Sequence, residues 1–291
     1  MKSLKLSNIL LAACCLVTTS AFAGCNDNDD KDGKAEILKP IARHLAGKWN
    51  CTASYIEKDG KWVNDPIPEG EGMTYTFRTD GTMVAQLTPG DGFTKFAKTR
   101  WETDDDACTL KMLSLTSDES TTSLIHVLTD KLFVLSGDWA TDSETGDQLT
   151  GEFKWEYTRV DETVKTPAEK IIGKWEYKYT YRKDENGEWK QYDNPYVPDK
   201  AWIEYHEDGT GTYYLKMGES EYKNSGKWDM NNTTVEIRTL SKDDGTVKSV
   251  TRITFEGDDA YSFTYTENLD VTTGEVMETG EFKDVWVRVQ Q

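Results

Sequence analysis

Histidine, cysteine and long apolar segments are scarce in this sequence, and each scarcity excludes a class of protein. Among the 291 residues there are three histidines and five cysteines. His44, His126 and His206 have no cysteine or second histidine at the spacing of a metal site, so we expect neither a metal nor a cofactor. Phosphate-binding glycine loops, dinucleotide fingerprints and nucleophile elbows are missing as well. We therefore expect a protein that is not an enzyme.

The principal apolar run covers residues 9–23 and is shorter than the roughly 20 residues that a membrane-spanning helix needs. It follows Lys2 and Lys5 and ends at a junction of small residues, Gly24-Cys25. A charged start, a short apolar core and a small-residue junction are typical of a cleaved export signal. We predict a signal peptide over residues 1–24.

The junction Phe22-Ala23-Gly24-Cys25 resembles the lipobox of bacterial lipoproteins. That resemblance implies that Cys25 becomes the first residue and carries lipid that holds the protein on a membrane. Residues 25–40 form an acidic tether and the start of a short helix, and the acidic run resembles the surface-export signal of Bacteroidetes-type lipoproteins. The resemblance implies an outer membrane lipoprotein exposed at the cell surface. Ordinary secretion is the alternative.

Acidic residues outnumber basic ones, 52 to 34. Loss of residues 1–24 removes two lysines and no acid, which leaves 32 basic residues against 52 acidic ones and a net charge of −20. So acidic a surface repels nucleic acid. Cys51 and Cys108 then remain in the folded part, and in an oxidising compartment they are a candidate disulfide. The alternative is two small buried thiols.

The second half of the chain repeats the first at a nearly constant shift. Gly47-Lys48-Trp49 matches Gly173-Lys174-Trp175, and Asp80-Gly81-Thr82 matches Asp208-Gly209-Thr210. Trp101 matches Trp228, and the segment from Gly151 matches the segment from Gly280. Such a match indicates an internal duplication. We predict one domain over residues 41–162, a linker over 163–170 and a second domain over 171–291.

Hydrophobic residues alternate with polar ones through most of each copy, as in Trp175, Tyr177, Tyr179 and Tyr181. Many such runs, separated by Asp-Gly and Gly-Asp turns, predict an all-β fold of short amphipathic strands. Helix is expected only within residues 35–47 and 166–173. The pattern fits an antiparallel sandwich or an up-and-down barrel of about eight strands.

Gly-x-Trp on the first strand and an arginine on the last strand resemble the lipocalins, and in particular bacterial lipocalin-like domains. The resemblance implies two tandem antiparallel up-and-down β-barrels. It also implies that an arginine lies over the tryptophan and closes one barrel end, pairing Trp49 with Arg159 and Trp175 with Arg288. We interpret these four residues as structural.

The resemblance implies a small ligand, a glycan or a planar or hydrophobic molecule, held inside a barrel. The second barrel is favoured because its expected inward positions are rich in tyrosine, whose hydroxyls call for water or a polar ligand. The alternative is a pair of filled barrels that contact another outer-membrane protein or a glycan through their outer faces. No particular protein partner is predicted. The candidate ligand-binding residues are Tyr177, Tyr179, Tyr181, Tyr205, Tyr213, Tyr261, Phe263 and Tyr265.

Overall fold

The computed structural model describes residues 36–141, 148–269 and 274–290. The predicted signal peptide, Cys25 and most of the tether lie outside these residues. The chain divides into two compact units, Met1–Val164 and Lys165–Gln291. No helix within the described residues is long and apolar enough to cross a membrane.

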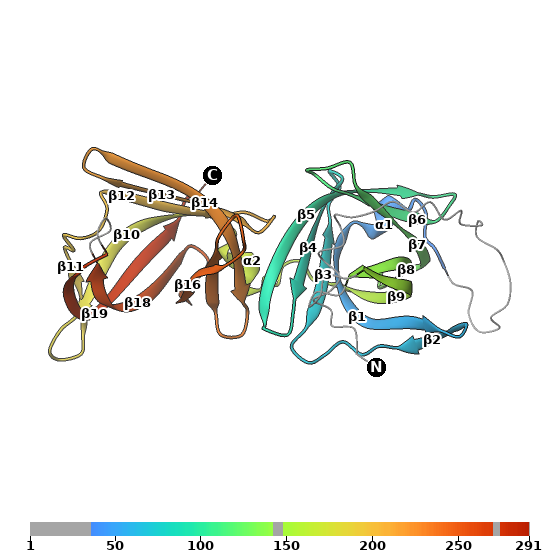
Figure 1. Ribbon diagram of the computed structural model, residues 1–291, viewed down its shortest axis with the longest axis horizontal. Coiled ribbons are helices and arrows are strands. Elements are labelled where there is room, and N and C mark those ends of the chain that lie inside the picture. The colour runs from blue at the N-terminus through green and yellow to red at the C-terminus, as the bar shows by residue number, and fades with distance from the viewer. Residues whose placement is uncertain (1–35, 142–147, 270–273, 291) are drawn as a thin grey trace. The chain divides into compact units, whose positions relative to one another are not determined.

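The first unit is an all-antiparallel barrel entered through a short helix (Figure 1). Trp49 and Cys51 point inward from β1 while Thr52 is exposed, as the alternation of the sequence predicts. Its elements are α1 (Ile41–Leu45), β1 (Gly47–Lys58), β2 (Lys61–Asn64), β3 (Gly72–Phe77), β4 (Thr82–Thr88), β5 (Phe93–Asp104), β6 (Thr109–Leu113), β7 (Ser120–Leu128), β8 (Leu132–Thr141) and β9 (Gln148–Val160).

Each strand of this barrel pairs with the next, and the ring closes where β1 lies between β3 and β9. Eight strands take part, because β2 only extends a hairpin with the far half of β1. The ladder between β7 and β8 runs from Leu124 opposite Ser136 to Leu128 opposite Phe133. This barrel is therefore hydrogen-bonded at every seam.

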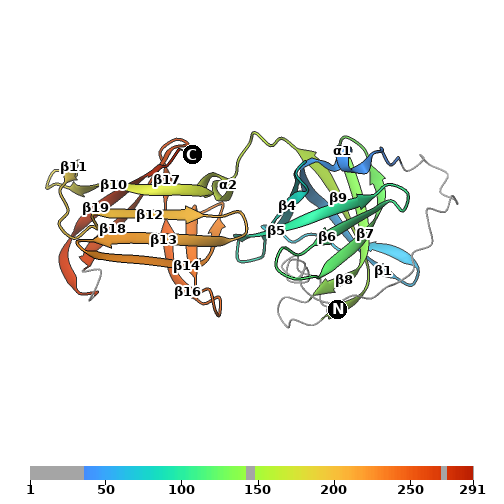
Figure 2. The same cartoon turned by 90° about the horizontal axis from the view of Figure 1, so that it is seen from above.

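The second unit repeats the same order of elements, and Figure 2 shows β10, β12, β13 and β14 side by side. Its elements are α2 (Pro167–Ile171), β10 (Gly173–Lys183), β11 (Trp189–Tyr192), β12 (Lys200–Tyr205), β13 (Thr210–Met217), β14 (Ser220–Asn231), β15 (Glu236–Leu240), β16 (Val247–Arg252), β17 (Thr254–Phe255), β18 (Ala260–Leu269) and β19 (Val276–Arg288).

The second ring closes less completely than the first. The strand that corresponds to β7 is broken at Ile253 into β16, which pairs with β15, and β17, which pairs with β18. Only Thr254 opposite Ser262 and Phe255 opposite Tyr261 join β17 to β18 among the described residues. The remaining closure, from β18 through β19 to β10, is continuous.

Turns as well as strands recur between the two units. Asp80 accepts hydrogen bonds from the backbone N–H and the hydroxyl of Thr82, and Asp208 does the same for Thr210. The β5–β6 and β14–β15 turns both end on a non-glycine residue with positive φ, 52° at Cys108 and 55° at Val235. The predicted all-β fold of two tandem up-and-down barrels is confirmed.

The interior of barrel 1 is filled by one continuous cluster of buried side chains. Its aromatic rings stack, with the ring of Tyr157 5.3 Å from that of Tyr75 and 5.4 Å from that of Phe133. Methionine and leucine complete the filling. The cluster includes Met73, Phe77, Met83, Ala85, Leu87, Trp101, Leu110, Met112, Leu135, Phe153 and Trp155.

Candidate functional site

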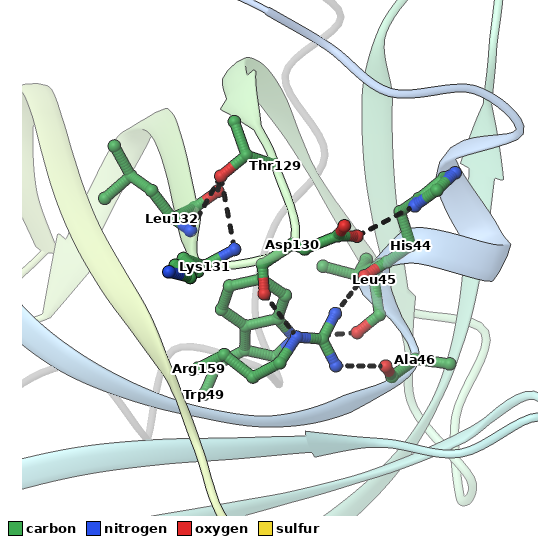
Figure 3. Close-up of polar contacts among 9 residues, drawn as sticks. All are labelled: His44, Leu45, Ala46, Trp49, Thr129, Asp130, Lys131, Leu132 and Arg159. Atoms are coloured by element: carbon green, nitrogen blue, oxygen red, sulfur yellow. Dashed lines mark hydrogen bonds and ion pairs between the residues drawn. The ribbon is translucent and has the colours of Figure 1, made fainter.

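The closed end of barrel 1 is built around Trp49 and Arg159 (Figure 3). The guanidinium carbon of Arg159 lies 4.2 Å from the centre of the Trp49 ring, which is fully buried. Its Nη1 donates to the carbonyl of Ala46 at 2.7 Å, and its Nε donates to the carbonyl of Asp130 at 2.9 Å. The indole N–H of Trp49 donates to the carbonyl of Leu45. One arginine therefore ties the last strand to the entry helix and to the β7–β8 turn.

Arg288 makes the same contacts in barrel 2, 4.1 Å above the ring of Trp175. Its Nη1 donates to the carbonyl of Ile172 and its Nε to that of Asp258. A side chain on Gly173 would meet the guanidinium at 2.7 Å, and φ at this glycine is 123°. Only glycine suits both conditions, which explains why the Gly-x-Trp motif occurs twice. These contacts are of the kind predicted for arginines that close the barrel ends. We call each arginine–tryptophan pair, Arg159 with Trp49 and Arg288 with Trp175, the clasp of its barrel.

Barrel 2 contains a cavity of about 770 Å³ that opens to solvent. Its inner wall is aromatic and aliphatic, and its remaining lining consists mainly of small polar residues. This volume falls in the range of small-molecule sites, roughly 300–1,000 Å³. The inner wall is formed by Ile203, Tyr205, Tyr213, Trp228, Ile237, Ile253, Tyr261, Phe263 and Trp286.

Three replacements relative to barrel 1 account for this space. The strand registers place Gly211 where barrel 1 has Met83, and Gly226 where it has Thr99. Thr239 likewise stands in place of Met112, beside the matched tryptophans. Each change removes side-chain volume from the interior, and the three residues all line the cavity. A Cβ on Gly211 would meet nothing closer than 3.4 Å, so the space there is real.

Five of the predicted ligand-binding residues lie on or beside this cavity as expected. Tyr205 and Tyr261 are buried and hydrogen-bonded to each other, and burial raises the pKa of both hydroxyls. Tyr213 and Phe263 also line the cavity, and Tyr213 is 38% exposed. Tyr177 points inward beneath Trp286, with its hydroxyl 2.9 Å from that of Thr180.

Tyr179 and Tyr181 were predicted to point inward, and the structure shows that this is wrong. A β-bulge between Tyr177 and Tyr179 inserts one residue into the ladder with β19 and reverses the alternation. Thr180 then faces the interior and is fully buried. Tyr181 lies on the outer face, where the amine of Lys283 sits 4.9 Å from its ring centre.

The eighth candidate, Tyr265, belongs to a polar network around Asp284. Its hydroxyl donates to Asp284 Oδ1 at 3.0 Å, and Thr180 donates to the same oxygen at 2.6 Å. Burial raises the pKa of the Asp284 carboxyl, while these two hydrogen bonds oppose the shift. The corresponding residue of barrel 1 is the buried Trp155. Trp155 lies opposite Ser54, just after the β-bulge of β1, and Asp284 lies opposite Thr180, just after the β-bulge of β10. Sequence reasoning did not single out Asp284.

A second hollow of about 540 Å³ lies along the weak seam between β16 and β18. Phe263 and Thr251 line both this hollow and the barrel cavity. Tyr265, Arg252 and Lys283 line the seam hollow alone. The two spaces are thus separated by shared side chains.

The candidate disulfide is not formed. In the described part of the chain, the thiol of Cys51 donates to the carbonyl of Ala53 at 3.6 Å, and that of Cys108 donates to the carbonyl of Asp105 at 3.7 Å. Burial raises the pKa of the Cys51 thiol to about 12. Both residues are buried thiols that fill space in barrel 1 and its β5–β6 turn. No cluster of three or more metal-ligating side chains occurs among the described residues.

Solved structures similar to this chain include the following two. One is a lipocalin-like protein from Bacteroides uniformis ATCC 8492, with 14% identity and a TM-score of 0.29 over 40% of this chain and 99% of that protein. The other is a protein of unknown function of the DUF3598 family from Nostoc punctiforme PCC 73102, with 10% identity and a TM-score of 0.24 over 84% and 97%. No protein-family model and no curated protein matches the chain.

Proposed function

We propose that barrel 2 binds a small molecule inside its cavity, whereas barrel 1 serves as a filled companion. The observation that carries this proposal is the cavity of about 770 Å³ at positions where barrel 1 places larger residues. Barrel 1 therefore shows that this fold does not require a cavity. An aromatic wall with a few hydroxyls suits a planar or hydrophobic molecule, or a sugar ring that stacks on tyrosine.

The polar groups of the cavity favour a ligand that carries at least one hydrogen-bond acceptor. Most tyrosine hydroxyls are already bonded within the protein, to Thr180, to Asp284 or to each other. The indole Nε1 of Trp286, by contrast, is buried without a partner among the described residues. A ligand acceptor that reached this N–H would offset the cost of its burial, about 1–3 kcal/mol.

The proposal is tested by titrating the chain with phenylnaphthylamine, an uncharged planar probe whose fluorescence rises in apolar surroundings. We expect saturable binding that is weakened at least tenfold in Gly211→Met, because the new side chain restores the volume that Met83 supplies in barrel 1. Ala97→Met, a matched substitution in barrel 1, should leave binding unchanged. Absence of binding, or equal binding by the Gly211 variant, would contradict the proposal.

We also propose that the barrels are carried on the outer membrane by lipid at Cys25, facing the cell surface. Support comes from the sequence of residues 1–33. Cys25→Ala should release the protein from the membrane fraction, whereas Cys51→Ala should not. Retention of the Cys25 variant through a carbonate wash would place the anchor elsewhere.

A further inference from the structure

The charged residues around the barrel 2 cavity leave its lining without net charge. Lys227 lies between the inward-facing Gly226 and Trp228 on β14, so its side chain lies on the outer face of the barrel. Hydrogen bonds from Thr246 and Ser241, together with the nearby ammonium of Lys248, lower the pKa of the Asp244 carboxyl to about 2. Charges of both signs are therefore present at neutral pH. The rim formed by residues 242–248 carries two of each sign, Lys242, Asp243, Asp244 and Lys248.

The closed end of the cavity is lined by four buried rings, which we call the aromatic floor. Trp286 lies two residues before Arg288 of the clasp, so the floor lies beside the closed barrel end. A flat apolar body can pack on these rings, whereas a charge placed among them would be costly to bury. The floor consists of Tyr205, Trp228, Tyr261 and Trp286, each no more than 9% exposed.

The mouth of the cavity differs from the floor because it carries unpaired polar groups. Tyr213 on β13 lies opposite Asn224 on β14, and both line the cavity. Asn224 precedes Trp228 by four residues, which places it about 13 Å nearer the open end at the usual rise of a strand. Among the described residues, neither the Tyr213 hydroxyl nor the amide nitrogen of Asn224 has a hydrogen-bond partner. Both groups are therefore available to a ligand.

Barrel 1 has no counterpart to this polar pair. Its register places Ala85 opposite Ala97 at the equivalent positions, one step along from Met83 opposite Thr99. Barrel 2 therefore removes volume at Gly211 and Gly226 and adds polar atoms at the next inward pair toward the mouth. Such a cavity suits a ligand with an apolar end and a polar end.

The polar groups at the mouth are amides and hydroxyls. The hydroxyls of Thr239 and Ser249 lie 2.6 Å apart on the same side of the cavity as Asn224. A ligand hydroxyl can accept from the Asn224 amide and donate to the Tyr213 oxygen, because a hydroxyl is both donor and acceptor. A purely apolar ligand would cover these groups without replacing their hydrogen bonds to water. The mouth therefore favours an uncharged group rich in hydroxyls.

We propose that the ligand of barrel 2 is an uncharged glycoside, in which a flat apolar body lies on the aromatic floor and the sugar lies at Tyr213 and Asn224. This rests on the proposed binding function and narrows its ligand class. It also assigns a binding role to Asn224, which sequence reasoning did not single out.

The test uses coumarin compounds that share one flat body and differ in the attached group. The glucoside, galactoside and mannoside of 4-methylumbelliferone carry an uncharged sugar, the glucuronide carries a carboxylate, and 7-methoxy-4-methylcoumarin carries no sugar. We expect the full chain to bind at least one uncharged glycoside about tenfold more tightly than the methoxycoumarin, because two hydrogen bonds each contribute modestly. The glucuronide should bind more weakly than the glucoside at low salt, because the chain is acidic overall.

The double variant Tyr213→Phe with Asn224→Ala keeps the tyrosine ring but removes both unpaired polar groups. It should bring the affinities for the glycoside and the methoxycoumarin to within about twofold of each other. The matched control is Thr212→Val with Ser225→Ala, the adjacent cross-strand pair on the outer face, and it should keep the preference. Gly211→Met should weaken both compounds, because both occupy the cavity.

Three results would overturn the glycoside proposal while the binding function stands. They are equal affinity for the uncharged glycosides and the methoxycoumarin, equal loss of preference in the two double variants, and tighter binding of the glucuronide than of the glucoside. Failure of the coumarins and of phenylnaphthylamine to bind would refute the binding function itself.

Discussion

The two barrels share a strand order, a clasp and their turns, yet one interior is filled and the other is hollow. In barrel 1, Met83, Thr99 and Met112 occupy the positions at which Gly211, Gly226 and Thr239 leave space in barrel 2. The clasp and the strand order are kept, whereas several inward-facing strand positions carry smaller residues and the seam between β17 and β18 is reduced to two residue pairs. The comparison shows that the hollow interior and the weakened seam occur in the same barrel, while the clasp is retained.

The largest expected effect comes from placing a carboxylate in the filled barrel. Trp155→Asp removes a buried indole and introduces a charge opposite Ser54, whose hydroxyl already donates to the carbonyl of Asp65, whereas Asp284 accepts from Thr180 and Tyr265. We expect a loss of about 4 kcal/mol or more in the stability of barrel 1. Hydrogen exchange of backbone amides, read by mass spectrometry for each barrel, measures this. Trp155→Phe should cost much less, and similar exchange rates in the two variants would contradict the account.

Hollowing barrel 1 sharpens the comparison directly. Met83→Gly copies Gly211 and should destabilise barrel 1 by about 3 kcal/mol, because the cavity it opens lies in a rigidly stacked aromatic core. The same exchange measurement reports the loss, and barrel 2 should be unaffected. A loss below about 1 kcal/mol would mean that barrel 1 collapses around the gap and that its filling is not tight.

The clasp should matter equally in the two barrels. Arg159→Ala and Arg288→Ala each remove one guanidinium–indole contact and several hydrogen bonds to backbone carbonyls. We expect each to cost about 2 kcal/mol in its own barrel. Lysine at either position keeps the charge but not the planar fork and should recover part of the loss. An effect on ligand affinity without an effect on stability would assign the clasp to function instead.

The smallest expected effect concerns the buried acid of barrel 2. Burial raises the pKa of the Asp284 carboxyl in the folded state above its value in the unfolded chain. The stability that the protonated carboxyl contributes is therefore complete below the unfolded-state pKa, and it is lost as pH rises through the folded-state pKa. Asp284→Asn should therefore stabilise barrel 2 at pH 7 and make no difference near pH 3. Denaturant unfolding at both pH values tests this, with the exposed Glu185→Gln as a control. Destabilisation at pH 7 would show that the carboxylate is needed for packing.

Much of this architecture was predictable because the two halves of the sequence can be compared with each other. The resemblance of Gly-x-Trp and the last-strand arginine to lipocalins predicted both clasps, the repeat predicted two domains, and strand alternation indicated the all-β fold. The hollow was also readable, since the shift that matches Asp80 to Asp208 sets Met83 over Gly211. The bulge after Tyr177 was not readable, because one inserted residue changes the direction of every later side chain without altering composition.

Each barrel begins and ends on neighbouring strands: Lys48 of β1 lies opposite Val160 of β9, and Trp175 of β10 lies opposite Arg288 of β19. A unit whose two ends emerge side by side can be copied head to tail with a short connector, without rethreading any strand. It can equally be opened at a distant hairpin and rejoined at its natural ends as a circular permutant. The arginine that spans this junction would then become an internal brace, and the order of the strands along the gene would change while their order around the barrel would not.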